Sequence, residues 1–436
     1  MPTYKTPGVY VEEISTLPPS VAEVATAIPA FIGTTASGAA GKVEVYQCST
    51  MLEYELRFGK PEPTEFEADA AGNIEPLDDP MPKWPMWYAL SLYYKNGGGR
   101  CYVVSVDNHA SGLSKARFEA GLAALEREDE PTLLVMPELV SLAQADFDDL
   151  CQQALAQCKK LGDRFAILDV KDGDVEKSRQ GYGADNLEYG AAYYPNIQTT
   201  LTHAYDETKV TIGSGNTAAT LASLKSSNTA LYNQIKKNLA EQRVELPPSA
   251  AVAGIYARVD RERGVWKAPA NVGVMSAIGP TMQITHDEQE SLNIEPTSGK
   301  SINAIRSFAG RGTLIWGART LAGNDNEWRY VSVRRLFIMI EESAKKATAF
   351  SVFEANDATT WLKVKGMLES YLYGLWEQGA LQGAAPEAAY YVNVGLGRTM
   401  SPRDVLEGRM IVELGVAAVR PAEFIVLRFS HKMAEA

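Results

Sequence analysis

The sequence predicts a protein of mixed class, an α/β layer joined to a second, α+β part. Three observations carry this prediction. Apolar runs alternate with amphipathic stretches between residues 100 and 200, two long amphipathic helices follow beyond residue 330, and strand-like segments return near the end of the chain. The 436 residues are enough for two or three domains with sizeable cores.

The first part of the chain is extended rather than helical. Residues 2–16, "PTYKTPGVYVEEIST", alternate apolar and polar side chains between prolines, which is typical of a strand. The apolar run "AIPAFIGTT" (27–35) predicts a buried strand. Residues 59–85 contain six prolines and several acids, and they predict an extended surface loop because proline cannot donate a backbone hydrogen bond.

The next stretch predicts the α/β layer. Short apolar runs are separated by helices whose apolar residues recur at helical spacing. Strands that are joined through helices by short connections lie parallel in one sheet. The expected elements are strands at 101–106, 132–136, 164–170 and 191–197, and helices at 114–128 and 143–161.

The second half of the chain predicts more helices and a strand-rich end. A helix is expected at 228–242, and the pair Pro247 and Pro248 that follows marks a domain boundary. Beyond it we expect helices at about 332–353 and 358–377, and strands at 388–396, 409–419 and 422–430.

The composition excludes several classes of protein. A net charge of −12 leaves no basic excess to neutralise phosphates, which argues against nucleic-acid binding and against docking on anionic membranes. No apolar run is long enough to cross a bilayer, so membrane insertion is not expected. The four cysteines form no CxxC pair, which indicates buried thiols in a reducing cytoplasm.

Motifs for catalysis, cofactors and metals are not found. "SGKS" (298–301) lacks the earlier glycine of a phosphate loop and predicts an ordinary turn. "HDEQE" (286–290) is not HExxH and predicts the solvated start of a helix. No GxGxxG follows the first strand of the layer. We therefore predict no enzyme, no catalytic residue, no cofactor and no metal, with a nucleotide- or metal-dependent cytoplasmic enzyme on the α/β layer as the alternative.

The two ends of the chain raise a separate question. A strand at a terminus has unpaired N–H and C=O groups, so it must join its own domain's sheet or pair with an open sheet edge on a neighbour. Residue chemistry leaves both possibilities open. A third hypothesis is a monomeric carbohydrate- or protein-binding module whose ends pair with its own sheet.

Six sequence blocks, in order, resemble the contractile tail sheath family of phage tails, R-type bacteriocins, type VI secretion and extracellular contractile injection systems. The resemblance is densest at the N-terminal arm and within 247–436. The blocks are "TPGVYVEEI" (6–14), "PAFIGTT" (29–35), "AAYYPNI" (191–197), "PPSAAVAGIYARVDRERGVWKAPAN" (247–271), "NAIRSFAGRGTLIWGARTL" (303–321) and "WRYVSVRRLFIMIEES" (328–343).

The resemblance implies a structural subunit that polymerises as stacked six-fold rings around an inner tube. Its partners would be copies of itself, the inner tube protein, and baseplate and tail-terminator or cap proteins. It would be made and assembled in the bacterial cytoplasm and become part of a virion tail or an injection particle. The implied domains are a donated N-terminal arm (1–22), an outer, more variable α/β domain (23–248), a sheath domain facing the inner tube (249–418) and a donated C-terminal arm (419–436).

The resemblance also implies where subunits meet and how the sheath moves. Strand donation would involve Val9, Tyr10 and Val11 in one arm, and Phe424, Ile425, Val426 and Leu427 in the other. Glu369 and Glu377 on the second long helix are candidates for contact with the inner tube. The extended sheath would be metastable, and contraction would proceed to a lattice of lower free energy without nucleotide hydrolysis.

Overall fold

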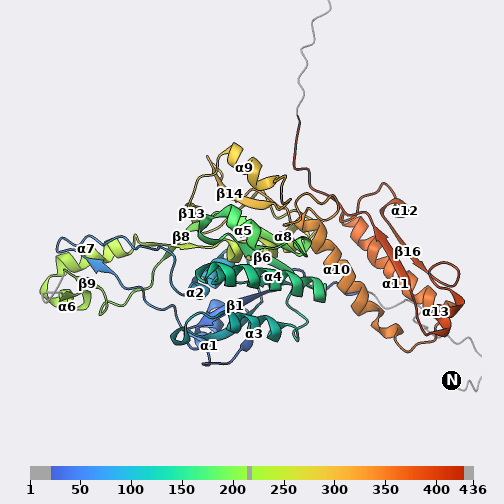
Figure 1. Cartoon of the computed structure of the whole chain (residues 1–436), viewed down its shortest axis with the longest axis horizontal. Helices are drawn as coiled ribbons and strands as arrows, with labels where there is room; N and C mark the ends of the chain where they lie inside the picture. The colour runs from blue at the N-terminus through green and yellow to red at the C-terminus, as the bar shows by residue number, and fades with distance from the viewer. Residues whose placement is uncertain (1–20, 214–218, 427–436) are drawn as a thin grey trace, which may run out of the picture. The chain divides into compact units, whose positions relative to one another are not determined.

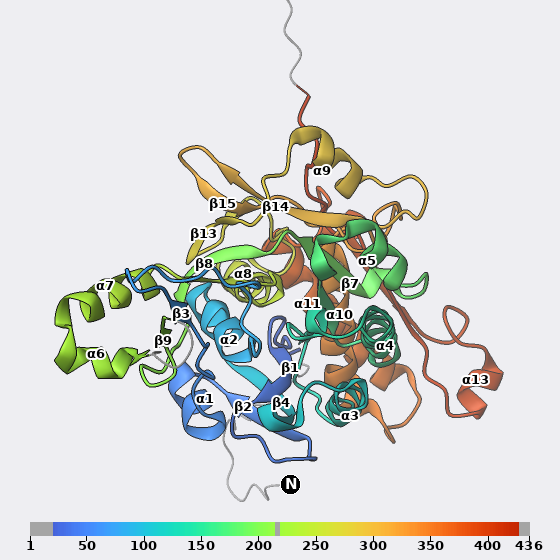
Figure 2. The ribbon, with the colours of Figure 1, turned by 60° about the vertical axis from the view of Figure 1, so that its left-hand side comes forward.

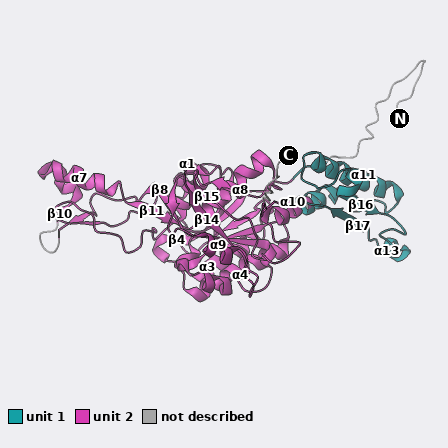
Figure 3. Ribbon diagram, turned by 90° about the horizontal axis from the view of Figure 1, so that it is seen from above, with its two compact units in different colours: residues 1–23, 341–419 teal, residues 24–340, 420–436 magenta. Residues whose placement is uncertain are grey.

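The computed structural model describes residues 21–213 and 219–426. These residues form two compact units (Figure 3). Unit 1 contains residues 21–23 and 341–419, and unit 2 contains the other described residues. Pro247 and Pro248, where a domain boundary was expected, lie inside unit 2, between a strand that ends at Leu246 and a helix that begins at Ser249.

Unit 2 is built on a nine-stranded mixed sheet (Figure 1). Its central six strands are parallel, and the strands at its edges are antiparallel to their neighbours. In spatial order the strands are β12 (Val272–Gly273), β15 (Gly312–Ile315), β14 (Ile302–Phe308), β7 (Gly190–Tyr194), β6 (Phe165–Asp169), β5 (Leu133–Val135), β1 (Pro29–Thr35), β4 (Cys101–Asn108) and β2 (Glu44–Cys48).

The predicted alternation of strands and helices is confirmed. Every residue of β1, β5, β6 and β7 is buried, as expected for strands covered on both faces. Helices α2 (Met86–Lys95) and α8 (Ser249–Arg263) pack together on one side of the sheet, while α3 (Lys115–Leu125) and α4 (Gln144–Leu161) pack on the other (Figure 2). The predicted strand at 191–197 divides, because β7 ends at Tyr194 and β8 begins at Ile197.

The prediction of a surface loop at 59–85 is partly wrong. Phe66 and Trp84 are buried, and strand β3 (Glu67–Ala68) pairs with β9 (Thr211–Ile212). Phe66 belongs to a second, smaller core, which it forms with residues of α6 (Leu221–Ser227) and α7 (Thr229–Leu239). The segment between these prolines therefore contributes buried residues to a small lobe. The many prolines correctly indicate little regular structure, but they do not predict that a few apolar side chains of the segment are buried.

The other elements of unit 2 complete its surface. A three-stranded sheet forms from β11, β8 and β13, and β10 joins β9 in the small lobe. The predicted helix start at 286–290 is confirmed, since Thr285 and Glu288 form a capping box. The remaining bounds are α1 (Met51–Phe58), α5 (Val175–Gly181), β8 (Ile197–Thr202), β10 (Ala219–Thr220), β11 (Arg243–Leu246), β13 (Ala277–Pro280) and α9 (His286–Asn293).

Unit 1 is a helical hairpin with a two-stranded sheet. Helix α10 (Val331–Thr348) begins among residues of unit 2 and ends in unit 1, and α11 (Ala358–Glu377) starts at an Asp357 cap whose carboxylate accepts from two backbone amides at 3.0 Å. Both helices were predicted. α11 packs against β16 (Tyr390–Val394), which pairs with β17 (Val412–Val416), and short helices α12 (Pro386–Ala389) and α13 (Pro402–Leu406) lie in the connections.

The last predicted strand, at 422–430, is not formed where the structure describes it. Residues 422–426 have no strand assignment, and the rest of that segment lies outside the described residues. A strand needs a partner for its backbone groups, and this segment has none within the described part of the chain.

Candidate subunit-interaction site

The two-stranded sheet of unit 1 has two open edges. Its register pairs Tyr391 with Gly415, and Ala417 donates its backbone N–H to Ala389 at 2.8 Å. In an antiparallel pair the hydrogen-bonded positions alternate. The backbone groups of Val412, Leu414 and Val416 therefore point away from β16.

The same alternation applies to β16. The backbone groups of Tyr390, Val392 and Val394 point away from β17. Among the described residues no further strand pairs with either edge. Each edge is therefore able to accept an added strand.

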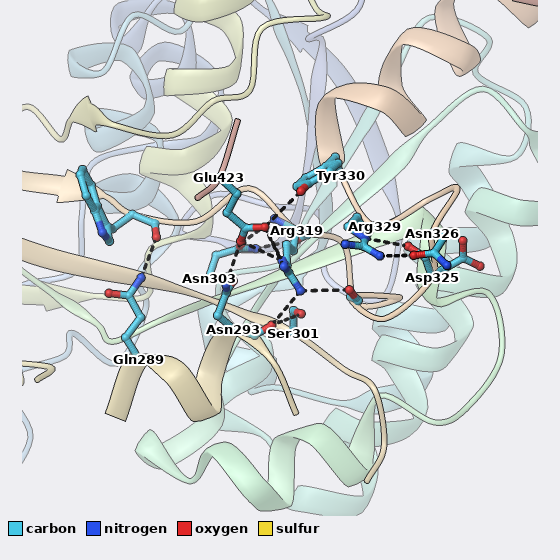
Figure 4. A network of polar contacts seen from close by, with 12 residues as sticks. Gln289, Asn293, Ser301, Asn303, Arg319, Asp325, Asn326, Arg329, Tyr330 and Glu423 are labelled. Atoms are coloured by element: carbon cyan, nitrogen blue, oxygen red, sulfur yellow. Dashed lines mark hydrogen bonds and ion pairs between the residues drawn. The ribbon is translucent and has the colours of Figure 1, made fainter. Parts of the chain in front are cut away.

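The second part of the site is the root of the C-terminal arm, residues 420–423, where Glu423 makes the contacts drawn in Figure 4. The carboxylate of Glu423 is held by the guanidinium of Arg319, which donates from Nη2 at 2.6 Å and from Nε at 2.9 Å. Asn293 donates to the same carboxylate at 2.7 Å and the hydroxyl of Tyr330 donates at 3.1 Å. Arg420 adds a bond to the carbonyl of Asn326 at 2.7 Å.

Arg319 is fixed by contacts that do not involve the arm. Its backbone N–H donates to Asn303 Oδ1 at 2.8 Å, and its carbonyl accepts from Asn303 Nδ2 at 2.8 Å. Its Nη1 donates to the carbonyls of Asn293 and Gly323 at 3.3 and 3.1 Å. Asn293 is the last residue of α9, so the cation also lies where the helix dipole is negative.

Burial and the neighbouring positive charge shift the pKa of Glu423 in opposite directions. The side chain of Arg319 is 3% exposed and that of Glu423 is 22% exposed. Burial on its own would raise the pKa of Glu423, but the hydrogen bonds from Arg319 and Asn293 and the positive charge of Arg319 outweigh it, so the pKa lies below its ordinary value. Burial and the charge of Glu423 raise the pKa of Tyr330. Glu423 is therefore ionised in neutral solution.

Directly after this root the arm becomes apolar and exposed. Phe424, Ile425 and Val426 are 67%, 79% and 76% exposed. Such a run of large apolar side chains in water is unfavourable unless a partner covers it. The predicted site residues Leu427, Val9, Tyr10 and Val11 lie outside the described residues.

The two predicted inner-tube residues lie on α11. Glu369 forms an ion pair with Lys365 at 3.5 Å, and Glu377 is exposed. A hydrogen bond to Glu377 raises the pKa of Tyr373, which is 41% exposed. The two carboxylates are eight residues apart on one helix, so they share a face. Burial and the negative charge of Glu369 raise the pKa of Tyr390, so Glu369 lies near this edge position of β16.

A buried acid lies where sheets of this class often bind ligands. The connections that follow β1 and β5 cover opposite faces of the sheet, so the carboxyl ends of these two strands form a topological switch point. Glu138, which is 0% exposed, lies there and accepts from the backbone and hydroxyl of Thr34 at 2.7 and 3.0 Å. In the described ranges no cluster of metal-ligating side chains occurs, and no helix there is both long and apolar enough for a bilayer.

Sequence reasoning missed the residues that hold the arm. Arg319 stands inside the block "WGARTL" and Glu423 directly precedes the apolar run "FIVL". An acid at the foot of a terminal apolar run is a usable signal, but its partner is 104 residues away and no spacing rule connects the two.

Comparison with known proteins identifies the family. The phage tail sheath protein central domain matches residues 114–321, and the phage tail sheath C-terminal domain matches residues 323–432. Among solved structures, a chain of the anti-feeding prophage (AFP) helical sheath in its contracted state is 32% identical, with 99% of this chain and 100% of that chain covered and a TM-score of 0.69. A chain of the PVC sheath complex, from an extracellular contractile injection system in its contracted state, is 31% identical over 99% of both chains, with a TM-score of 0.67.

Two curated phage proteins of the same family match a shorter part of this chain. The tail sheath protein of Vibrio phage KVP40 is 24% identical over 188 residues, which are 42% of this chain and 26% of that protein. The tail sheath protein of Enterobacteria phage T4 is 25% identical over 132 residues, 30% of this chain and 19% of that protein. The chain thus spans about a quarter or less of the length of these two phage proteins.

The fold, the two domain matches and the full-length structural likeness define a contractile sheath subunit. The chain belongs to the contractile tail sheath family.

Proposed function

We propose that this protein is the structural subunit of a contractile sheath, which polymerises as stacked six-fold rings around an inner tube and contracts to drive the tube through a target envelope. Two features of the chain that complement each other support this most directly. Unit 1 has a sheet with two open edges, and the arm has an exposed apolar segment that pairs with no strand among the described residues. A chain with both features completes its hydrogen bonding by pairing with other copies.

Strand pairing suits a lattice that has to move. Each backbone hydrogen bond contributes on the order of 1 kcal/mol net, and a strand supplies several of them at once. The arms can therefore keep neighbouring subunits together while side-chain contacts elsewhere are exchanged. Subunits joined head to tail in this way form open helical assemblies.

Contraction in this proposal draws on the lattice and not on a bound nucleotide. The extended sheath is a kinetically trapped state, and the contracted lattice lies lower in free energy. A buried carboxyl, that of Glu138, lies at the switch point where related sheets bind anionic ligands, and this supports the proposal. The comparisons give no support to the enzyme alternative.

The proposed partners are copies of the same chain, an inner tube protein, and baseplate and cap proteins at the two ends. Nucleic acid and membrane insertion have no part in it. Glu369 and Glu377 are proposed to contact the inner tube weakly in the extended state. Replacing both with lysine should reduce co-sedimentation with the tube, and unchanged co-sedimentation would remove them from the contact.

Negative-stain microscopy of the purified protein tests the proposal. The full-length chain should form tubes or stacked rings, and deletion of residues 1–17 should abolish them while leaving the monomer folded. The proposed function would be contradicted by a full-length protein that stays monomeric at every protein and salt concentration tested, both with and without added baseplate proteins.

A further inference from the structure

We propose that Arg319 is the positioning residue of the C-terminal arm, and that it holds Glu423 in a socket that is formed before any neighbour arrives. This inference rests on the proposed function, because it assigns the fixed point from which the apolar segment after Glu423 is presented to another copy. The socket consists of Arg319, Asn293 and Tyr330 (Figure 4).

The socket is preorganised by unit 2 alone. Asn303 holds the backbone of Arg319 from both sides, and the carbonyls of Asn293 and Gly323 hold its Nη1. This leaves Nε and Nη2 free to grip a carboxylate side on. A guanidinium that is already fixed loses little freedom when it binds, which strengthens a bidentate pair.

The occupant is Glu423 of the same chain. Its carboxylate receives four donors from three side chains, and all of these bonds lie within 3.2 Å. Arg420, three residues earlier, adds a second attachment to unit 2. The chain enters unit 2 at residue 420, directly after Val419 has donated its backbone N–H to Ala380 in unit 1.

The consequence is a short anchored segment followed by an exposed apolar one. The side chain of Glu423 is 22% exposed, whereas Phe424 next to it is 67% exposed. The position and direction of the donated strand are therefore set at residue 423. Without the socket the apolar residues would search a larger volume, and the effective concentration of the strand at a neighbouring edge would fall.

The test compares Glu423→Gln with Glu262→Gln, which neutralises an exposed acid on α8. Glu423→Gln keeps the shape of the side chain and removes the charge that Arg319 binds. We expect the protein concentration needed for tube assembly to rise about tenfold for Glu423→Gln, because a charge-assisted pair is weakened, while the unfolding midpoints of both variants match the wild type. Arg319→Lys, which cannot bind side on, should shift assembly in the same direction.

Two results would overturn the inference. One is assembly of Glu423→Gln at the wild-type concentration. The other is a drop in its unfolding midpoint large enough to explain the loss of assembly, which would make the pair a structural contact only. If the wild type forms no tubes, the proposed function fails, and the socket is judged separately by limited chymotrypsin cleavage of the monomer at Phe424. That cleavage should accelerate several-fold in Glu423→Gln and not in Glu262→Gln if the socket holds the arm.

Discussion

At the scale of single residues, two carboxyl groups that are shielded from solvent to different degrees have different partners. Glu423 is paired with an arginine and its pKa is lowered, whereas Glu138 accepts hydrogen bonds from the neutral residue Thr34. Burial raises the pKa of Glu138 to about 8, and the hydrogen bonds from Thr34 oppose the rise only in part. The same fold thus keeps one acid ionised at the arm and another protonated beside Thr34.

Glu138→Gln should flatten the pH dependence of stability. The folded pKa lies above the ordinary value of 4.5, so the stabilisation from the protonated group is complete below about pH 4.5 and is lost as the pH rises towards 8. In urea unfolding between about pH 5 and 7, the variant should lose less stability with rising pH than the wild type, by about 1.4 kcal/mol per pH unit. Glu262→Gln is the control. An unchanged slope would mean that the native carboxyl is already ionised.

At the scale of elements, two features bear on assembly and stability: the open edges of the unit 1 sheet and the connection between the small lobe and the rest of unit 2. The outer edge of β17 is proposed to accept an arm. The small lobe with α6 and α7 joins the rest of unit 2 through segments that meet at His203, whose Nδ1 lies 3.0 Å from Thr64 Oγ1 and whose Nε2 lies 3.1 Å from the carbonyl of Pro80. The first feature rests on unpaired backbone groups, and the second rests on the hydrogen bonds of one side chain.

Proline substitutions can distinguish the role of the open edge of β17 from that of its pairing with β16. Val416→Pro removes an N–H that points away from β16, whereas Glu413→Pro removes one that points towards Asn393. We expect Val416→Pro to fold with a nearly unchanged unfolding midpoint but to fail in tube assembly. Glu413→Pro should destabilise unit 1 by about 3 kcal/mol. Normal tubes from Val416→Pro would show that this edge accepts no strand.

The connection at His203 should loosen in acid. Burial lowers the pKa of His203 below 6.5, and the hydrogen bond to the Pro80 carbonyl opposes this only in part. The stabilisation from the neutral ring is therefore complete above about pH 6.5 and is lost as the pH falls. Limited proteolysis of the small lobe should therefore accelerate several-fold between about pH 7 and pH 5. His203→Gln should lose this acceleration, and His286→Gln on exposed α9 should retain it. Equal behaviour of the two variants would exclude His203 as the cause.

These elements show how far sequence reasoning reached. Strands β1, β4, β5 and β6 and helices α4, α10 and α11 were predicted because burial on both faces or on one stripe leaves a periodic pattern. Strand β3 has two residues and no period to detect. The pairing of Arg319 with Glu423 is a tertiary contact between distant positions, and a single sequence contains no signal for it.

At the scale of the whole molecule, the chain alternates between its two units. It leaves unit 2 within α10 and re-enters it at residue 420, where the arm root is attached. The open sheet belongs to unit 1 and the exposed arm segment to unit 2. In the proposed sheath, donor and acceptor are thus carried by different units of each subunit, and each copy is completed by others.

A cryo-electron microscopy structure of assembled tubes tests this claim most directly, because it shows what pairs with β16 and β17. The account predicts that backbone groups of Val412, Leu414 and Val416, or those of Tyr390, Val392 and Val394, are hydrogen-bonded to a terminal segment of a neighbouring copy. Tubes in which both edges remain unpaired, or pair only with the chain's own ends, would contradict it.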